Sequence, residues 1–244
     1  MKSRAPIAIS YRPKAQDYLP VVVAAIRRHL GDWPVVLLTG KEHLPPENWI
    51  ESNKIEAITD WQHSAGANKI LRLWEHQEVF AAHFDRWIWW HDDMLLLRPL
   101  EAPEAEFARP LVRHGQRKRP NRELNNWHNM LWDTLGFFRC LSIAAPNPVM
   151  HTPRLIEREG LQAIPAQWNR SRLLFEPTYL LWQWHRMGQQ PEVAEDFRIC
   201  QFEGDIPPIA ELEDSPCTIF NWGRHIDHAA AAGEFGRLYP LDYG

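Results

Sequence analysis

Short apolar runs alternate with amphipathic segments along the first hundred residues of the chain. Residues 34–39 form a continuous aliphatic run, which is typical of a strand buried on both faces. Further strands are expected at 6–10, 55–58, 87–90 and 94–97. Residues 17–30 and 67–84 carry apolar positions at helical spacing. This order of strands and helices predicts an α/β fold with a mostly parallel central sheet.

The second half of the chain has a less regular pattern. We expect helices at 123–138, 178–187 and 224–232, and strands at 148–151 and 197–202. No repeat and no convincing linker interrupts the sequence. The pattern therefore predicts a single domain over residues 1–244, with an elaborated second half.

Composition narrows the class of protein. The formal net charge of −4 excludes a uniformly basic, nucleic-acid-binding coat. Three cysteines are too few for a disulfide framework. The longest aliphatic run, Val21 to Ile26, is too short to span a membrane, and the N-terminus has no secretory apolar region. We expect a soluble, cytoplasmic protein, and no obligate protein partner is evident.

The most informative segment for chemistry is an apolar strand that leads directly into His91, Asp92 and Asp93, with a second apolar run behind them. Carboxylates between two core segments are costly unless they have partners. At the carboxyl end of a parallel strand they face the crevice where α/β proteins bind ligands. Oxygen ligands with one imidazole suit Mn²⁺ or Mg²⁺. The alternative is a strand-end turn whose carboxylates cap nearby amides.

This segment resembles the DxD region of nucleotide-sugar glycosyltransferases of the GT-A fold, with His91 in place of the first acid. Residues 68–74 are similar to the preceding helix of that family, and residues 7–13 and 34–40 to its first two strands. The resemblance implies a Rossmann-like GT-A fold. It also implies a nucleotide-sugar-binding half at 1–100 and an acceptor-binding half at 101–244.

The resemblance also implies roles for individual residues. Asp93 is expected to bind the metal, Mn²⁺ in preference to Mg²⁺, and to be catalytic. Further metal ligands are expected among His91, Asp92 and His225. His91 could equally contact the ribose, and so could Asp92. The residues expected to bind the nucleoside-diphosphate sugar are Ser10, Tyr11, Arg12, Thr39, Lys69, Arg72 and Asp92.

Glu176 is the candidate catalytic base. It opens a predicted helix that ends at Gly188, and this spacing is similar to an acidic motif of inverting glycosyltransferases. The helix dipole favours an acid at that position. Pro177 stands where the motif has its second acid. The alternative is a helix-terminal acid that takes no part in chemistry.

Three late histidines, His151, His225 and His228, could complete a metal shell, with His225 the first candidate. His225 and His228 share one face of the predicted last helix.

The basic run at 109–122 holds six Lys or Arg and no acid. It could hold phosphates of a donor, a lipid-linked acceptor or a nucleic acid, or it could be a solvated loop. The residues expected to bind the acceptor are Arg117, Lys118, Arg119, Trp127, Trp182 and Trp222. The acceptor itself could be a glycan, a lipid-linked sugar or a hydroxymethylated DNA base, which would have to be extruded from the duplex.

Two other functions remain open. One is a Stealth-type transferase of hexose phosphate, because residues 151–153 are similar to a region of those enzymes. The other is an inactive nucleotide- or glycan-binding module on the same fold.

Overall fold

The structure is a computed structural model. It describes residues 4–13, 18–61, 69–113, 126–194, 196–226, 233–237 and 239, without the side chains of residues 126, 202, 203, 209 and 224–226.

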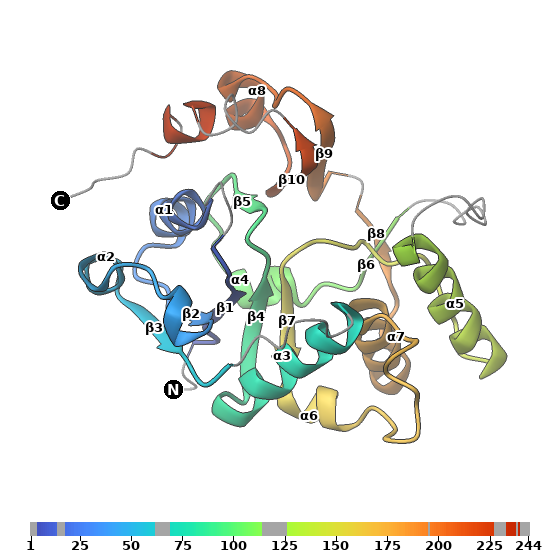
Figure 1. The fold of residues 1–244 in the computed structure, drawn as a ribbon. Helices are drawn as coiled ribbons and strands as arrows, with labels where there is room; N and C mark the ends of the chain where they lie inside the picture. Colours follow the sequence, from blue (N-terminus) through green and yellow to red (C-terminus); the bar gives the residue numbers. More distant parts are fainter. Residues whose placement is uncertain are drawn as a thin grey trace.

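A central sheet has its strands in the order β3-β2-β1-β4-β7 (Figure 1). These strands are β1 (Ile7–Ser10), β2 (Val35–Leu38), β3 (Ile55–Ile58), β4 (Arg86–Trp90) and β7 (Arg154–Glu157). The strands β1 to β4 run parallel, and β7 is antiparallel to β4. The prediction of an α/β fold with a mostly parallel central sheet is confirmed.

Side chains alternate across this sheet and form two cores. Ile88 and Trp90 of β4 belong to the core that includes helix α1 (Leu19–Leu30). Trp87 and Trp89 belong to the core on the other face, against α3 (Lys69–His83), α5 (Asn126–Cys140) and α7 (Phe175–Met187). These four side chains are at most 1% exposed. The apolar sequence of β4 thus follows from its burial on both faces.

The second half adds two smaller sheets. One contains β5 (Met94–Leu96), β10 (Ile219–Ile226) and β9 (Arg198–Gly204), in that order. The other pairs β6 (Leu111–Val112) with β8 (Glu192–Val193). The shorter helices are α2 (Glu47–Ser52), α4 (Pro103–Phe107), α6 (Arg158–Gln162) and α8 (Ile209–Asp214), with a 3₁₀ turn at Lys41–His43.

Two predicted elements are wrong. The last helix, predicted at 224–232, begins in β10, because the backbone there pairs with β9 as far as Ile226; residues 227–232 lie outside the described part. The strand predicted at 148–151 is only an isolated bridge from Pro148 to Val112, and the nearby strand is β7. The other predicted strands and helices match described elements to within a few residues. None of the described helices is both long enough and apolar enough to cross a membrane.

Candidate functional site

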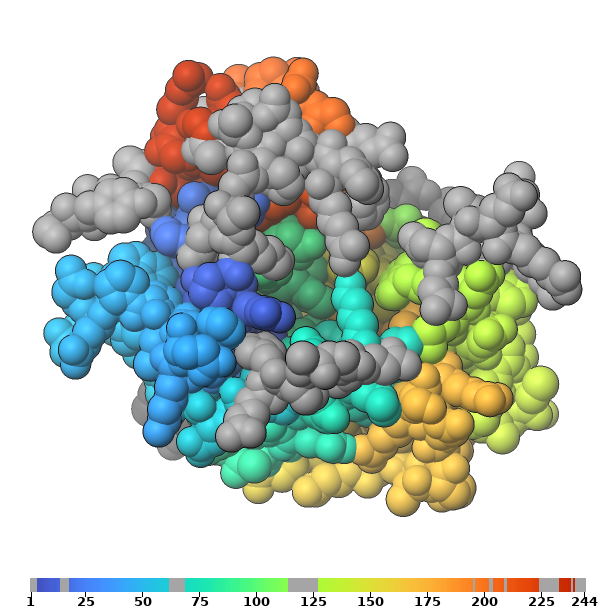
Figure 2. Space-filling view, viewed as in Figure 1, coloured from blue at the N-terminus to red at the C-terminus, as the bar shows by residue number. Residues whose placement is uncertain are grey.

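The order of the strands changes direction between β1 and β4. The chain proceeds from β1 outward through β2 to β3, and then returns to place β4 on the other side of β1. Ligands of open α/β sheets bind at such a switch point, outside the carboxyl ends of the strands. Figure 2 shows the molecule hollowed in its middle, where the green part of the chain is recessed between the blue, red and yellow-green parts.

The turn of His91, Asp92 and Asp93 directly follows β4 at this edge. Its last residue is fixed to the second sheet, because the backbone oxygen of Asp93 accepts hydrogen bonds from Asn221 Nδ2 (2.9 Å) and from the backbone N–H of Trp222 (3.2 Å). The side chains of the turn are partly exposed. The acidic turn is therefore held from both sides, by β4 and by β10.

His91 contacts Glu176, although the two residues lie 85 positions apart in the sequence. His91 Nε2 lies 2.8 Å from Glu176 Oε1. Glu176 is in the first turn of α7, where the helix dipole favours a negative charge, and is only 8% exposed. The contact joins the acidic turn to the helix layer that covers this face of the sheet.

The charges of this pair stabilise each other. Burial lowers the pKa of His91, but the hydrogen bond to Glu176 and the charges of Glu176, Asp93 and Asp92 outweigh it, and the pKa is raised. Burial raises the pKa of Glu176, but the hydrogen bond and charge of His91 dominate and lower it to about 2. At neutral pH these shifts favour an imidazolium beside a carboxylate.

Trp89 provides a competing contact for the same ring nitrogen. Its indole Nε1 lies 3.0 Å from His91 Nε2. An indole N–H can only donate, so this contact favours His91 with Nε2 unprotonated. The Glu176 carboxylate favours the opposite state, because it can only accept. His91 Nε2 thus has a neighbour suited to each of its protonation states.

His151 supports Glu176 through its backbone. Its φ of 52° lies in the left-handed region, which is uncommon for a residue other than glycine. Its N–H donates to Glu176 Oε2 at 3.3 Å, and its carbonyl accepts from Arg198 Nη1 at 2.8 Å. Burial lowers the pKa of the His151 ring to about 4, so the ring is neutral at pH 7. The strained backbone thus connects Arg198 to Glu176.

Arg154, in β7, fixes the segment that leads to His151. It is 2% exposed, and its guanidinium donates to the carbonyls of Val149 (2.7 Å) and Arg109 (3.1 Å). Burial lowers its pKa to about 10, so it remains charged at neutral pH. A buried charge held by backbone carbonyls keeps the loop before His151 in place.

A complete metal shell is not assembled by the described side chains. Among them, no three His, Cys, Asp or Glu side chains lie in an arrangement able to hold a metal ion. Asp92 and Asp93 could supply oxygen ligands, but Nε2 of His91 faces Glu176. His225 lies in β10, and its side chain is outside the described part. The Mn²⁺ or Mg²⁺ site stays a prediction.

The residues predicted to bind the donor lie around the same edge. Ser10 ends β1, and Tyr11 and Arg12 follow it. Thr39 directly follows β2 and is completely buried. Lys69 and Arg72 are in α3, where Lys69 is the first residue and Arg72 is partly exposed, and Asp92 lies in the acidic turn itself. The Lys69 charge also contributes to the lowered pKa of His151, which places Lys69 near the site.

The residues predicted to bind the acceptor are only partly described. Arg117, Lys118 and Arg119 lie outside the described residues, as does His228. Trp127, at the start of α5, lies beside the site, with its ring 5.5 Å from that of His151. Trp182 donates to the carbonyl of Ala163 (2.8 Å), and Trp222 is 2% exposed. Packing accounts for the last two tryptophans.

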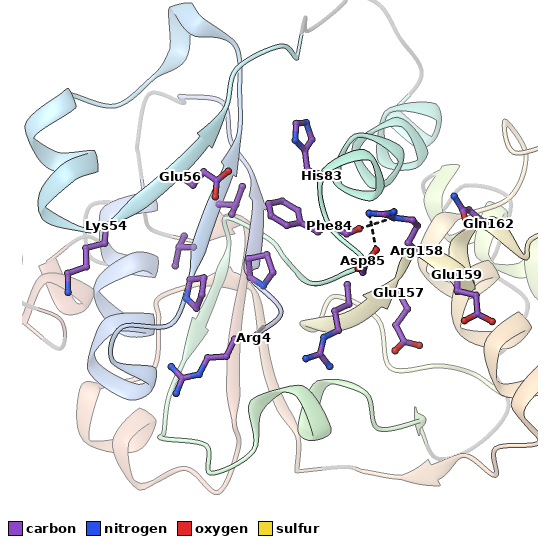
Figure 3. Close-up of a pocket in the computed structure, with 15 residues that line it drawn as sticks. Arg4, Lys54, Glu56, His83, Phe84, Asp85, Glu157, Arg158, Glu159 and Gln162 are labelled. Atoms are coloured by element: carbon purple, nitrogen blue, oxygen red, sulfur yellow. Dashed lines mark hydrogen bonds and ion pairs between the residues drawn. The ribbon is translucent and has the colours of Figure 1, made fainter. Parts of the chain in front are cut away.

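A separate hollow lies at the opposite, amino-terminal edge of the sheet (Figure 3). Its volume is about 830 Å³, and it includes the starts of β2 and β4. Its charges are mostly neutralised within the protein: Arg158 pairs with Asp85 (3.0 Å), and Lys54 with Asp32 (2.9 Å). This hollow lacks the acidic turn, so we place the candidate site at the carboxyl edge.

Sequence patterns did not single out Arg154 and Arg198, or Arg113, whose charge acts on Arg198. Arg154 and Arg198 are single cations at the starts of strands, a pattern that does not differ from that of surface strands. Arg113 falls in the basic run at 109–122, which was the available signal.

No protein-family model matches the sequence, and no curated protein matches it. Among solved structures, the chain is similar to the apo form of mouse xyloside xylosyltransferase 1. The sequences are 9% identical, the TM-score is 0.41, and the alignment covers 89% of this chain and 97% of that one.

Proposed function

We propose that the chain is a glycosyltransferase that uses a nucleoside-diphosphate sugar and transfers the sugar to a hydroxyl acceptor. The observation that carries this proposal is the contact between His91 and Glu176, which joins the acidic turn to α7 at the switch point of the sheet. The proposal is supported further by the resemblance of that turn to the DxD region.

The nucleotide is assigned to the carboxyl ends of β1 and β2. This is where doubly wound sheets bind nucleotides. Buried Thr39 and partly exposed Ser10 supply hydroxyl groups there. Lys69, the first residue of α3, adds a positive charge suited to the phosphates, at the helix end where the dipole favours anions. The diphosphate then points toward the acidic turn.

His91 is assigned to the leaving diphosphate. In transfer, the acceptor hydroxyl oxygen bonds to the anomeric carbon and its proton passes to the leaving diphosphate. The bond from that carbon to the diphosphate oxygen breaks, and its electron pair stays on that oxygen. Negative charge grows on the diphosphate, and a preorganised positive charge there stabilises the transition state. The upward shift in the His91 pKa favours an imidazolium.

Glu176 is assigned to holding His91 rather than to taking a proton. A carboxyl group with a pKa of about 2 is a weak base at neutral pH. Glu176 is also buried and engaged by both His91 and the His151 N–H. In this proposal it is a positioning residue.

The test is a screen of nucleotide sugars, with and without Mn²⁺ and Mg²⁺, that identifies the nucleotide released. We expect release of a nucleoside diphosphate, and its loss in Asp93→Asn. Asp133→Asn, at an exposed site on α5, is the matched control and should leave release unchanged.

Two outcomes would replace the proposal. Release of a nucleoside monophosphate would indicate transfer of a hexose phosphate. Tight binding of a nucleotide sugar without any turnover, with glycan and hydroxymethylated DNA acceptors both present, would indicate a binding module.

A further inference from the structure

Two arginines lie near each other on the side of the site that is formed by the second half of the chain, residues 101–244. Arg198 is the first residue of β9, and Cys200 lies on the same face of that strand. Arg113, the residue after β6, lies near enough for its charge to lower the pKa of the Cys200 thiol, against the larger effect of burial. The Arg113 charge also acts on Arg198, where it opposes protonation. Two positive charges thus lie beside one thiol.

This pair has no direct counter-charge in the described part of the chain. Neither arginine there forms an ion pair within 4 Å, whereas Arg109 pairs with both Glu106 and Glu192. The carboxylates of Glu176 and Asp93 act on Arg198 only from beyond ion-pair distance. Arg198 is partly buried, so water screens its repulsion from Arg113 less than it would between two exposed charges. The pair is therefore suited to an anion from outside the chain.

The hydrogen-bonding capacity of Arg198 is also incompletely used. Nη1 donates to the His151 carbonyl, while Nε is buried and has no hydrogen-bond partner among the described residues. A guanidinium prefers the paired oxygens of a phosphate or carboxylate. Arg113 is exposed, so the pair can be approached from solvent.

The position of the pair indicates which substrate carries the anion. Arg198 contacts His151, and the His151 N–H contacts Glu176, so the pair is adjacent to the proposed reacting groups. Arg113 directly follows β6 and Arg198 begins β9, and both strands lie on the other side of β4 from β2 and β3 (Figure 1). The nucleoside is assigned to the β1 and β2 side.

We propose that Arg113 and Arg198 bind an oxyanion, a phosphate or a carboxylate, that the acceptor carries near its reacting hydroxyl. This inference rests on the proposed glycosyl transfer and names the substrate class: an anionic acceptor. The acceptor enters from the side formed by residues 101–244, and its negative charge neutralises the two arginines.

The test measures binding of inorganic phosphate and of acetate by calorimetry, and binding of uridine and guanosine diphosphates in parallel. The variants are Arg113→Gln, Arg198→Gln and Arg198→Lys, with Arg186→Gln as the matched control. Arg186 is exposed near the end of α7 remote from Glu176. Because Arg113 is exposed, its variant should fold normally, and circular dichroism checks this for each protein.

We expect at least one of the two anions to bind to the wild type. Each Gln variant should weaken it by about tenfold or more, which is the usual effect of losing a charged hydrogen bond. Arg198→Lys should weaken it less, since the charge is kept, and Arg186→Gln should have no effect. Nucleoside-diphosphate affinity should be the same in all variants.

Other results would overturn the inference. If neither anion binds to the wild type, the arginine pair is not an anion site. If the Gln variants weaken nucleoside-diphosphate binding by the same factor, the pair serves the donor and not the acceptor. If anions bind as expected but no nucleoside diphosphate binds, the proposed function fails together with the acceptor assignment, while the anion site itself stands.

Discussion

At the scale of single residues, the central feature of the candidate site is a buried ion pair. His91 and Glu176 have side chains that are 16% and 9% exposed, so both charges are largely removed from water. Desolvation of two charges can cost more than their attraction returns, but removal of one partner leaves an uncompensated buried charge. The backbone N–H of His151 partly offsets the cost for Glu176. Such a pair is sensitive to substitution and to pH.

The pH dependence of stability follows from the two pKa shifts. The raised pKa of His91 contributes stability that is fully present below 6.5 and is lost as the pH rises through its folded-state pKa. The lowered pKa of Glu176 contributes stability that is present above 4.5 and is lost as the pH falls toward 2. The free energy of unfolding contributed by the pair should therefore be largest between about pH 4.5 and 6.5.

Urea unfolding across this pH range, compared between the wild type and a His91→Gln, Glu176→Gln double variant, measures that contribution. The difference in the free energy of unfolding between the two proteins should be largest between about pH 4.5 and 6.5. A difference that is flat from pH 4 to 8 would contradict the ion pair.

The single variant Glu176→Gln tests the role of the carboxylate. It leaves His91 without its negative partner, and we expect a loss of about 3 kcal/mol in the free energy of unfolding. Nucleotide-sugar binding should fall much less than the rate of transfer, because His91 would no longer be held protonated. Equal losses in binding and in rate would argue that Glu176 has only a structural role.

At the scale of elements, α7 is the helix that brings Glu176 to the sheet. The sequence predicts that it ends at Gly188, and the structure confirms this, with φ of 61° at Gly188. A left-handed residue at this position favours glycine because other residues are strained there. A Cβ at Gly188 would meet no atom within 4 Å, so conformational strain is the only cost of a larger residue.

Two glycine substitutions separate this strain from ordinary helix propensity. Gly188→Ala should lower the free energy of unfolding by about 1 kcal/mol. Gly136→Ala, inside α5, also meets no atom within 4 Å and should raise it by about 0.5–1 kcal/mol. Thermal and urea unfolding measure both. Two effects of the same sign would contradict the assigned helix end.

The elements also show how far the sequence could be interpreted. Strands β1, β2 and β4 could be predicted because strands buried on both faces are continuously apolar. The strand β7 could not be predicted, because it begins with a charged residue, Arg154. The hydrogen bonds to backbone carbonyls that allow Arg154 to be buried cannot be inferred from the sequence. The sequence at the end of β10 predicts a helix. The segment is a strand as far as Ile226, because pairing with β9 overrides the local propensity.

The site was predictable in its parts but not in its assembly. His91 and Glu176 each came from a separate pattern, and their contact depends on how α7 packs on the sheet. The conformation of His151, which gives Glu176 a second partner, has no sequence signature. Arg113 follows β6 and Arg198 begins β9, and these strands belong to different sheets, so the effect of one charge on the other depends on the tertiary fold.

At the scale of the whole molecule, the two edges of the central sheet differ in their chemistry. The carboxyl edge carries the acidic turn, Glu176 and the arginine pair, and the amino edge carries a hollow whose charges are mostly paired. The central claim is that the nucleotide binds at the carboxyl edge.

Hydrogen–deuterium exchange with uridine or guanosine diphosphate tests this claim most directly. We predict slower exchange in peptides that cover Ser10 to Arg12 and His91 to Met94, with no change in peptides that cover Lys54 or Arg158. Protection confined to the amino edge, or no protection at saturating nucleotide, would contradict the account.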